Sequence, residues 1–506
     1  MIGAPGSLVW LARFELKLMQ RDLARIRPAV AWLLLFVFLS MHVVGWLLLR
    51  HGVKIDLPPV FIALCASLAL AFIFGLMVAK ALTSCVQAIH GRRDLDLLLS
   101  APLPARRIVT VRMATVSFGV ALPFVFLVGP FLNALAFLGR PSYLAGYVVV
   151  FALALVATMI GLALSLALMR AVGPRRAETS AQIIGALFGA AAFLVAQARV
   201  LLPASWIHAA LLWLGHQADA AAFHGADPLW MWPGWAAMGD SPRLVSVVAA
   251  SILAFALGSL ALAPAVSAWA RASFGAPSKI LAPSAPSRRG LAPRVGARRA
   301  LFVKEWRLLA RHPLTIFHTL MKSLYLAPLA LVALRAGDAT LSAAAVSGLI
   351  VAISLQLGAA LAGNTMRGEQ AADLIAGAPM SAREVRAIKL AAALGPVILI
   401  AAAACLCVAQ SAPKAAAVAF GFSLLASAVA GQLALWNEEP PRRADLRRRD
   451  SDLSPMAFVE VALTLCFGGV AFGAIRGDWW AALPAVIACL LFMAMSPRRE
   501  RKPAAA

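Results

Sequence analysis

Residues that could do chemistry are few in this 506-residue chain, and their spacing favours no reactive centre. His208, His216 and His224 recur at a step that turns each side chain about 80° from the last on a helix of 3.6 residues per turn. They share no face that could hold a metal ion, so we expect no metal site. The six cysteines lie in or beside apolar runs without a metal-ligand spacing, which favours small core residues.

A nucleotide site is not expected either. No stretch of the form G-x-x-x-x-G-K-[ST], which cradles nucleotide phosphates, occurs in the chain, and no polar stretch is long enough for a nucleotide-binding domain. We therefore expect no enzyme activity and no cofactor bound by this chain. Lys322 and Glu460 fall inside apolar segments and are candidate intramembrane polar residues. The long side chain of Lys322 could also reach the headgroup region.

The elements that must position these residues are membrane spans. Apolar residues make up 62% and charged residues 13% of the chain, whereas soluble proteins have roughly 45–50% and about 25%. A span needs roughly 20 apolar residues, and its backbone must pair within the segment, which predicts helices. We predict an all-α polytopic membrane protein with about twelve spans. These lie at about 28–49, 57–79, 112–136, 143–169, 181–202, 244–269, 316–334, 340–362, 387–409, 415–435, 455–475 and 479–495.

The positive charges indicate the orientation of these spans. The formal net charge of +24 lies between the apolar runs and not on one compact face, which argues against a nucleic-acid partner. If the N-terminus is cytoplasmic, 37 of the 46 Lys and Arg residues lie on that side and 8 on the other. Cytoplasmic loops carry such an excess, so we expect both termini in the cytoplasm and membrane lipid around the spans. We expect the inner (plasma) membrane of a bacterial cell.

Two motifs occur twice. Asp96–Ile108 aligns with Asp373–Val385 without a gap, and Arg112 then falls on Lys389. Each copy follows the second span of its half and precedes the third. The second motif is a short basic amphipathic stretch just before the first span of each half, in which "RFELKLMQRD" (13–22) resembles "VKEWRLLARH" (303–312). Such a stretch is expected to lie in the headgroup plane.

This repetition predicts two six-span halves in parallel order. The first half would cover residues 1–270 and the second 300–506. Residues 271–299 are rich in Pro, Gly and Ser and are predicted to form a cytoplasmic linker.

The repeated segment, at about 92–106 and about 368–383, cannot be a span. The four charged residues between 92 and 96 would cost about 10–14 kcal/mol at the bilayer centre, and the nearby leucines would return only about 2–3 kcal/mol. Pro102 and Pro379 break a helix, and Ser381-x-x-Glu384 has the pattern of a capping box. We predict a short transverse helix that docks on a protein partner; the alternative is a plain amphipathic loop resting on lipid.

This layout resembles the type-2 ABC permeases, the membrane subunits of ABC exporters with an ABCG-like fold. The resemblance covers the layout of nearly the whole chain but only about 30 residues of motif in each half. It implies a permease subunit of an ATP-driven exporter, with ATP hydrolysed by a separate ABC ATP-binding subunit that is present in two copies. The transported substrate is unknown. In that family a long external segment often joins spans five and six, and Pro203–Trp235 fits; the second half has only "IRGDWW" there.

The resemblance also implies roles for particular residues. The stretch before the first span is an elbow helix, here at about 10–26 and about 300–312, and the repeated segment is a coupling helix that docks on the ATPase. The implied coupling positions are Asp96, Leu97, Leu98, Pro102, Arg106, Asp373, Leu374, Ile375, Pro379 and Arg383. The implied elbow positions are Glu15, Lys17, Arg21, Glu305, Arg307 and Arg311.

Two other functions remain open. A twelve-span secondary transporter is one, since "HGRRDL" after the second span resembles a loop motif of the major-facilitator carriers. Ala88 stands where that motif has an aspartate, however, and the second copy reads "MRGEQA". A non-transporting membrane scaffold is the other.

Overall fold

The computed structural model shows a chain built of helices. The described residues are 7–24, 28–52, 58–91, 104–198, 202–224, 228–275, 296–311, 321, 339–369, 375, 377, 379–437 and 455–496. No strand occurs among them, and nine of their helices are long and apolar enough to cross a membrane. The described chain is that of an all-α, multi-pass membrane protein.

The nine long apolar helices coincide with nine of the predicted spans. Two further predictions fall on α2 (Pro28–Gly52) and α20 (Ala482–Met495), which contain shorter apolar stretches. The prediction at 316–334 lies outside the described residues except for Met321. The full number of spans is therefore still a prediction.

The chain divides into two compact units, Met1–Arg288 and Arg289–Ala506. The division falls inside the predicted linker, but helices enter this linker from both ends. Helix α11 (Ser241–Gly275) extends past the predicted boundary at 270, and α12 (Ala297–Arg311) begins before 300. Helix α11 contains no proline after Pro264, so nothing in its last turns breaks the helix before Gly275.

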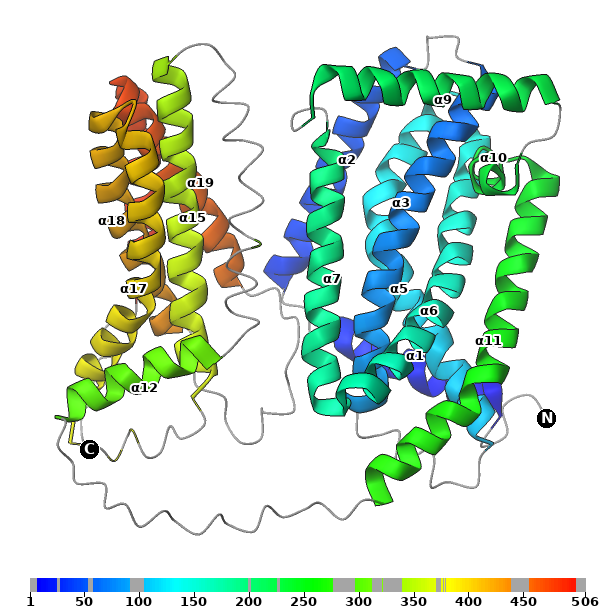
Figure 1. The fold of residues 1–506 in the computed structure, drawn as a ribbon, viewed down its shortest axis with the longest axis horizontal. Coiled ribbons are helices and arrows are strands. Elements are labelled where there is room, and N and C mark those ends of the chain that lie inside the picture. The colour runs from blue at the N-terminus through cyan, green and yellow to red at the C-terminus, as the bar shows by residue number, and fades with distance from the viewer. Residues whose placement is uncertain are drawn as a thin grey trace. The chain divides into compact units, whose positions relative to one another are not determined.

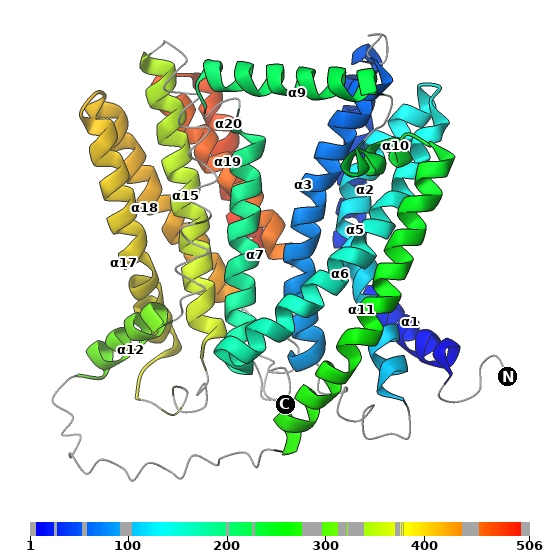
Figure 2. The same ribbon diagram turned by 45° about the vertical axis from the view of Figure 1, so that its right-hand side comes forward.

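The first unit is a bundle of long helices with shorter helices across its two ends (Figures 1 and 2). Its long helices are α2, α3 (Pro59–Val86), α5 (Ala105–Phe137), α6 (Ala145–Val172), α7 (Pro174–Ala196) and α11. Its shorter helices are α1 (Leu8–Ala24), η1 (Gln87–Gly91), η2 (Pro141–Leu144), α9 (Ala204–His224), η3 (Leu229–Met231) and α10 (Trp232–Ala237). Helix α1 crosses the end at which α5 begins, and α9 crosses the opposite end.

Small residues let the helices of this bundle approach closely. Helices α3 and α6 cross where Gly161 lies over Ala81, and a Cβ atom on Gly161 would lie only 2.6 Å from that of Ala81. Helix α6 ends at Gly173, whose φ of +79° is unfavourable for other residues, and Pro174 then begins α7. Large apolar side chains such as Leu162 and Met113 fill the core around this crossing.

The second unit contains α12, α15 (Ala339–Arg367), α17 (Ala382–Ala409), α18 (Pro413–Asn437), α19 (Pro455–Arg476), η5 (Trp479–Ala481) and α20. Helix α15 lies at its centre and contacts α17, α18 and α19. Helix α12 crosses the end of the unit at which α17 begins (Figure 2). Gly358 on α15 packs against the backbone of Ser427 on α18, as Gly161 packs on Ala81 in the first unit.

The start of the third predicted span differs from the sequence expectation. Helix α5 begins at Ala105, seven residues before the predicted start at 112. Pro104 precedes its first turn, where a missing N–H costs nothing. The first turns of α5 carry Arg106 and Arg107, which are exposed, so the helix continues beyond its apolar part.

Candidate functional site

A buried ion pair joins α1, the predicted elbow helix of the first unit, to its bundle. Helix α1 turns Leu11 and Glu15, one turn apart, toward the bundle, and both are buried. The guanidinium of Arg112 on α5 donates from Nη1 to Oε1 of Glu15 at 2.5 Å. Arg112 is 4% exposed and Glu15 is 5% exposed, so both charges are removed from water.

The second unit contains an ion pair in the corresponding place. Helix α12 turns Leu301 and Glu305 toward its bundle, and Glu305 is fully buried. Nζ of Lys389 on α17 lies 3.1 Å from Oε1 of Glu305. Leu301 and Glu305 correspond to Leu11 and Glu15 in the repeat of the elbow stretch, and Lys389 corresponds to Arg112.

Two further charged residues enlarge the ion pair of the second unit. Nζ of Lys389 also donates to Oε2 of Glu369 at 3.0 Å and to the carbonyl oxygen of Thr365 at 2.8 Å. Nζ of Lys304 donates to Oε2 of Glu369 at 2.5 Å and to Oε1 of Glu305 at 3.2 Å. Lys389 therefore connects α12, α17 and the end of α15. We call Lys304, Glu305, Glu369 and Lys389 the four-charge cluster.

The charges of this cluster shift the pKa values of Glu369 and Lys304. Burial alone would raise the pKa of Glu369, but hydrogen bonds and charges from Lys304 and Lys389 outweigh it and lower that pKa. Burial alone would lower the pKa of Lys304, but its hydrogen bonds and the charges of Glu369 and Glu305 raise it. Both groups are therefore held in their charged forms.

These ion pairs are suited to holding helices together, because each joins buried side chains of two different helices. Separating a buried pair exposes each charge to an apolar surrounding without its partner, which is costly. Each elbow helix is therefore expected to move together with the start of α5 or α17. Lys17 and Arg307 are exposed on their helices, and the side chains of Arg21 and Arg311 lie outside the described residues.

The repeated segment itself is described only in part. Asp96, Leu97, Leu98, Pro102, Asp373 and Leu374 lie outside the described residues. Arg106 and Arg383 are exposed in the first turns of α5 and α17. Ile375 is half-buried in a helical turn, and Pro379 is exposed in a bend. The docking roles of these residues therefore stay predictions.

The capping box at the start of α17 is confirmed. The backbone N–H of Glu384 donates to Oγ of Ser381 at 3.2 Å, and the backbone N–H of Ser381 donates to Oε2 of Glu384 at 3.1 Å. Nη2 of Arg298 on α12 also donates to Oε1 of Glu384 at 2.5 Å. The second repeated segment is thus joined to α12 at its far end as well.

Of the two candidate intramembrane polar residues, the structure describes only Glu460. Lys322 lies outside the described residues. Glu460 is half-buried near the start of α19, and its carbonyl oxygen accepts from the hydroxyl of Thr464. The side-chain amide of Gln356 on α15 donates to the same hydroxyl at 2.8 Å. These contacts link α15 and α19 by polar groups within their apolar segments.

A polar cluster in the first unit was not predicted. Nδ1 of His42 on α2 lies 2.7 Å from the carbonyl oxygen of Phe38, and Nε2 lies 3.0 Å from Nδ2 of Asn133 on α5. The hydroxyl of Tyr147 on α6 donates to Oδ1 of Asn133 at 2.9 Å. Isolated polar residues in apolar runs carry no spacing signal, so the sequence could not indicate that these three meet.

The long segment before the sixth helix forms a surface helix and a packed turn. Trp206 and Trp213 are exposed on α9, as are His208 and His216; the side chain of His224 is outside the described residues. Among the described residues, no group of three or more His, Cys, Asp or Glu side chains could hold a metal ion.

Helix α10, by contrast, packs against α3. Oγ of Ser67 donates to the carbonyl oxygen of Met231 and accepts from the N–H of Gly234. Any side chain on Gly234 would clash with the carbonyl oxygen of Ala63. This close approach fixes α10 at the end of the bundle, over the start of α3.

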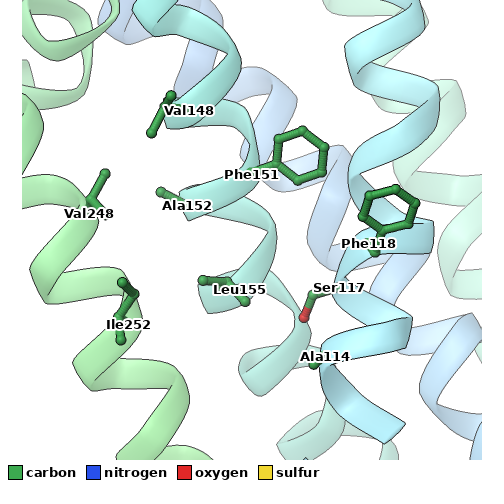
Figure 3. Close-up of a pocket in the computed structure, with 9 residues that line it drawn as sticks. All are labelled: Ala114, Ser117, Phe118, Val148, Phe151, Ala152, Leu155, Val248 and Ile252. Carbon is green, nitrogen blue, oxygen red and sulfur yellow. The ribbon is translucent and has the colours of Figure 1, made fainter. Parts of the chain in front are cut away.

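An apolar groove lies on the first unit between α5, α6 and α11. It has a volume of about 300 Å³, and Figure 3 shows Phe118, Phe151 and Ile252 among its lining residues. Ser117 is its one lining residue with a polar side chain, and the hydroxyl donates to the carbonyl oxygen of Met113 at 2.9 Å. The groove could accept an apolar chain but offers no group for a charged ligand.

No protein-family model, curated protein or solved structure matches the chain. The geometry of the described residues and the internal repeat are therefore the basis for a functional proposal.

Proposed function

We propose that the chain is the transmembrane permease subunit of an ATP-driven exporter and that it works with a separate ATP-binding subunit. The two halves would be parallel repeats, each with an elbow helix and a segment that docks on the ATPase. The single observation that supports this best is the duplicated ion pair between elbow helix and third helix, Glu15–Arg112 and Glu305–Lys389.

This observation bears on coupling because of where the two pairs lie. Each repeated segment directly precedes α5 or α17, and each ion pair attaches the first turns of that helix to the elbow helix. A force applied to a repeated segment would be carried to two membrane elements together. ATP-driven closure of two ATPase subunits could then bias a two-state change in the helices.

The proposed orientation places the repeated segments, both termini and the linker in the cytoplasm. The excess of Lys and Arg on that side supports it. Arg106 and Arg383, which are exposed at the starts of α5 and α17, would face the cytoplasmic partner. Helix α9 would lie at the external end of the first unit, with Trp206 and Trp213 at the headgroup level.

Co-purification with the product of an adjacent ATPase gene tests the proposal. Replacement of Leu97, Leu98, Leu374 and Ile375 with Asp should abolish association, because charges at an apolar docking surface are costly to desolvate. The matched control replaces Leu211 and Leu212 with Asp, which are exposed on α9 at the opposite end of the first unit. Association that survives the first set, or is lost equally with the control, would contradict the docking assignment.

Transport measurements separate this function from the alternatives. Vesicles that contain the chain and its ATPase should move substrate only with ATP. A secondary transporter would move substrate in response to an ion gradient and would not respond to ATP. A scaffold would move no substrate under either condition.

A further inference from the structure

The polar cluster of His42, Asn133 and Tyr147 lies toward the end of the first unit that α9 crosses. Asn133 is one turn before the end of α5, and Tyr147 is in the first turn of α6. All three residues are half-buried. Polar groups in an apolar bundle need hydrogen-bond partners, so the direction of each hydrogen bond shows what this cluster can hold.

The contacts of His42 define its neutral form. The carbonyl oxygen of Phe38 can only accept, so Nδ1 of His42, 2.7 Å away, carries the hydrogen. The hydroxyl of Tyr147 donates to Oδ1 of Asn133 at 2.9 Å, which leaves Nδ2 of the same amide to face Nε2 of His42 at 3.0 Å. Nε2 therefore accepts, and the ring has one hydrogen and no charge.

We propose that His42 is a reversible proton-binding site and that Asn133 supplies the acceptor for the added proton. A charged imidazole donates from both ring nitrogens and needs two acceptors. The Phe38 carbonyl oxygen serves Nδ1 in both forms. Rotation of the Asn133 amide by half a turn exchanges its oxygen and nitrogen, so that Oδ1 accepts from Nε2 of the charged ring.

Tyr147 can satisfy the amide in both orientations. Its hydroxyl lies 3.2 Å from the carbonyl oxygen of Gly129 and can donate there, so that the hydroxyl oxygen then accepts from Nδ2 of the reversed amide. A Cβ atom on Gly129 would lie only 2.8 Å from this hydroxyl oxygen, so glycine makes the approach possible. The ring, the amide and the hydroxyl thus have partners whether His42 is neutral or charged.

Hydrogen bonds must stabilise this proton, because no carboxylate is at hand. Helices α2, α5, η2 and α6, which build and border the site, contain no Asp or Glu. The Phe38 ring packs on the imidazole at 4.6 Å between centroids and has no formal charge. The other charged or titratable residues of these elements and their connection at this end are Arg50, His51, Arg140, Tyr143 and Tyr147. The two arginines disfavour a further positive charge, which leaves the stabilisation to the two acceptors.

The helices that build the site provide no path for the proton to the other end of the unit. The remaining ionisable side chains of α2, α5 and α6 are arginines near that other end: Arg106, Arg107, Arg112 and Arg170. Arginine keeps its proton, so it cannot pass one on. The site would therefore respond to the pH on the α9 side of the membrane. This role goes beyond the proposed exporter function and requires no ATPase.

Nitrogen-15 NMR of the histidine-labelled full chain in lipid nanodiscs tests the proposal, and His42→Gln identifies the signal of this ring. At pH 8 we expect a neutral ring with its hydrogen on Nδ1, because Nδ1 faces the Phe38 carbonyl oxygen. Nε2 should gain a proton between pH 8 and pH 5, the range in which histidine ordinarily changes its charge. A ring hydrogen on Nε2 at pH 8, or an unchanged ring at pH 5, would overturn the proposal.

Two variants of Asn133 test the acceptor in opposite directions. Asn133→Leu removes the amide oxygen, and His42 should then bind its proton about tenfold more weakly, which lowers the pH of half-protonation by about one unit. Asn133→Asp supplies a carboxylate and should raise that pH by about one unit or more.

Thr115→Val is the matched control, because it removes a hydroxyl from the same helix toward its other end. The titration of His42 should not change in this variant. A titration that is equal in the unmodified chain and both Asn133 variants, or that shifts as much in the control, would overturn the assignment. Because no ATPase is present, these results and those of the docking experiment can fail separately.

Discussion

At the residue scale, the carboxylates of Glu15 and Glu305 are buried charges that depend on a neighbouring cation. Each is almost fully removed from water and lies against a cation from the third helix of its unit. Desolvation of two charges offsets much of their attraction, so such a pair adds little net stability. It does make the helix contact specific, because the wrong packing would bury a charge without its partner.

Loss of the Arg112 guanidinium should therefore lower the stability of the first unit. Arg112→Met leaves a carboxylate buried at 5% exposure without its guanidinium, and we expect about 3–5 kcal/mol of destabilisation. Lys17→Met, on an exposed side chain of α1, should stay within about 0.5 kcal/mol. Unfolding in detergent, followed by circular dichroism, measures both, and equal effects would contradict the importance of the pair.

The same measurement on a double variant separates charge from packing. Glu15→Leu together with Arg112→Met removes both charges, so it should cost less than Arg112→Met alone. A double variant that is less stable than the single one would indicate that the contact contributes by its packing and not by its buried charge.

The four-charge cluster should also respond to pH. The pKa of Glu369 is lowered, so its contribution is present above the unfolded value of about 4.3 and is lost as the pH falls through the folded pKa. The pKa of Lys304 is raised, so its contribution is present below about 10.4 and is lost as the pH rises through the folded pKa. Among the described residues, Glu305 contacts Lys304 and Lys389 contacts Glu369.

Protection of α12 against hydrogen exchange, corrected for the intrinsic pH dependence, should accordingly be greatest between about pH 5 and pH 10. It should fall on both sides of this window. Glu369→Gln removes the group that titrates on the acid side, so the protection of α12 should fall less in this variant as the pH is lowered. If protection falls equally in the variant and the unmodified protein, another carboxylate causes the loss.

At the element scale, close helix crossings determine the packing of each bundle. A Cβ atom on Gly161 would lie 2.8 Å from the carbonyl carbon of Ala81 and 2.9 Å from the N atom of Leu82. Both are backbone atoms, which cannot turn aside as a flexible side chain can. Helix α6 must therefore shift away from α3 if Gly161 gains a side chain.

Gly161→Ala should consequently destabilise the first unit by about 1–3 kcal/mol. The matched control is Gly119→Ala on α5, where a Cβ atom would meet no atom of the described residues within 4 Å. This control should be neutral or slightly stabilising, because alanine favours a helix. Thermal unfolding of the two variants measures the difference, and equal melting temperatures would refute the close crossing.

The start of α17 gives a second element-scale prediction. Ser381→Ala removes the side-chain acceptor of the capping box and should cost about 0.5–2 kcal/mol. The effect should be local, with faster hydrogen exchange in the first turn of α17. Ser411→Ala, at an exposed serine beyond the other end of this helix, is the control. Exchange that is unchanged at 382–385 would contradict the cap.

At the scale of the whole molecule, the orientation in the membrane follows from the distribution of charge. We predict that His216→Cys on α9 reacts with a membrane-impermeant maleimide in intact cells and that Arg106→Cys on α5 reacts only after permeabilisation. Both residues are exposed, and in the first unit they belong to opposite ends (Figure 1). The background should have its six native cysteines replaced, and labelling of both sites from one side would refute the predicted topology.

The all-α, multi-pass membrane class and the approximate positions of nine spans were predictable from the amino-acid sequence. Apolar length and charge asymmetry are local properties, so nine helices appear where the spans were predicted. The capping box at Ser381 was also predictable, because both partners lie within one turn. The elbow glutamates could be aligned, but their partners could not be assigned.

The contacts of the aligned residues, by contrast, follow from how the helices pack. Glu15 meets Arg112 across 97 positions of sequence, and Lys304 meets Glu369 across 65. His42, Asn133 and Tyr147 likewise meet from three helices. Helical periodicity specifies which face a residue occupies, but not which neighbour that face packs against. That choice depends on the fit of helix surfaces, where small residues allow close approach and a buried charge requires its partner.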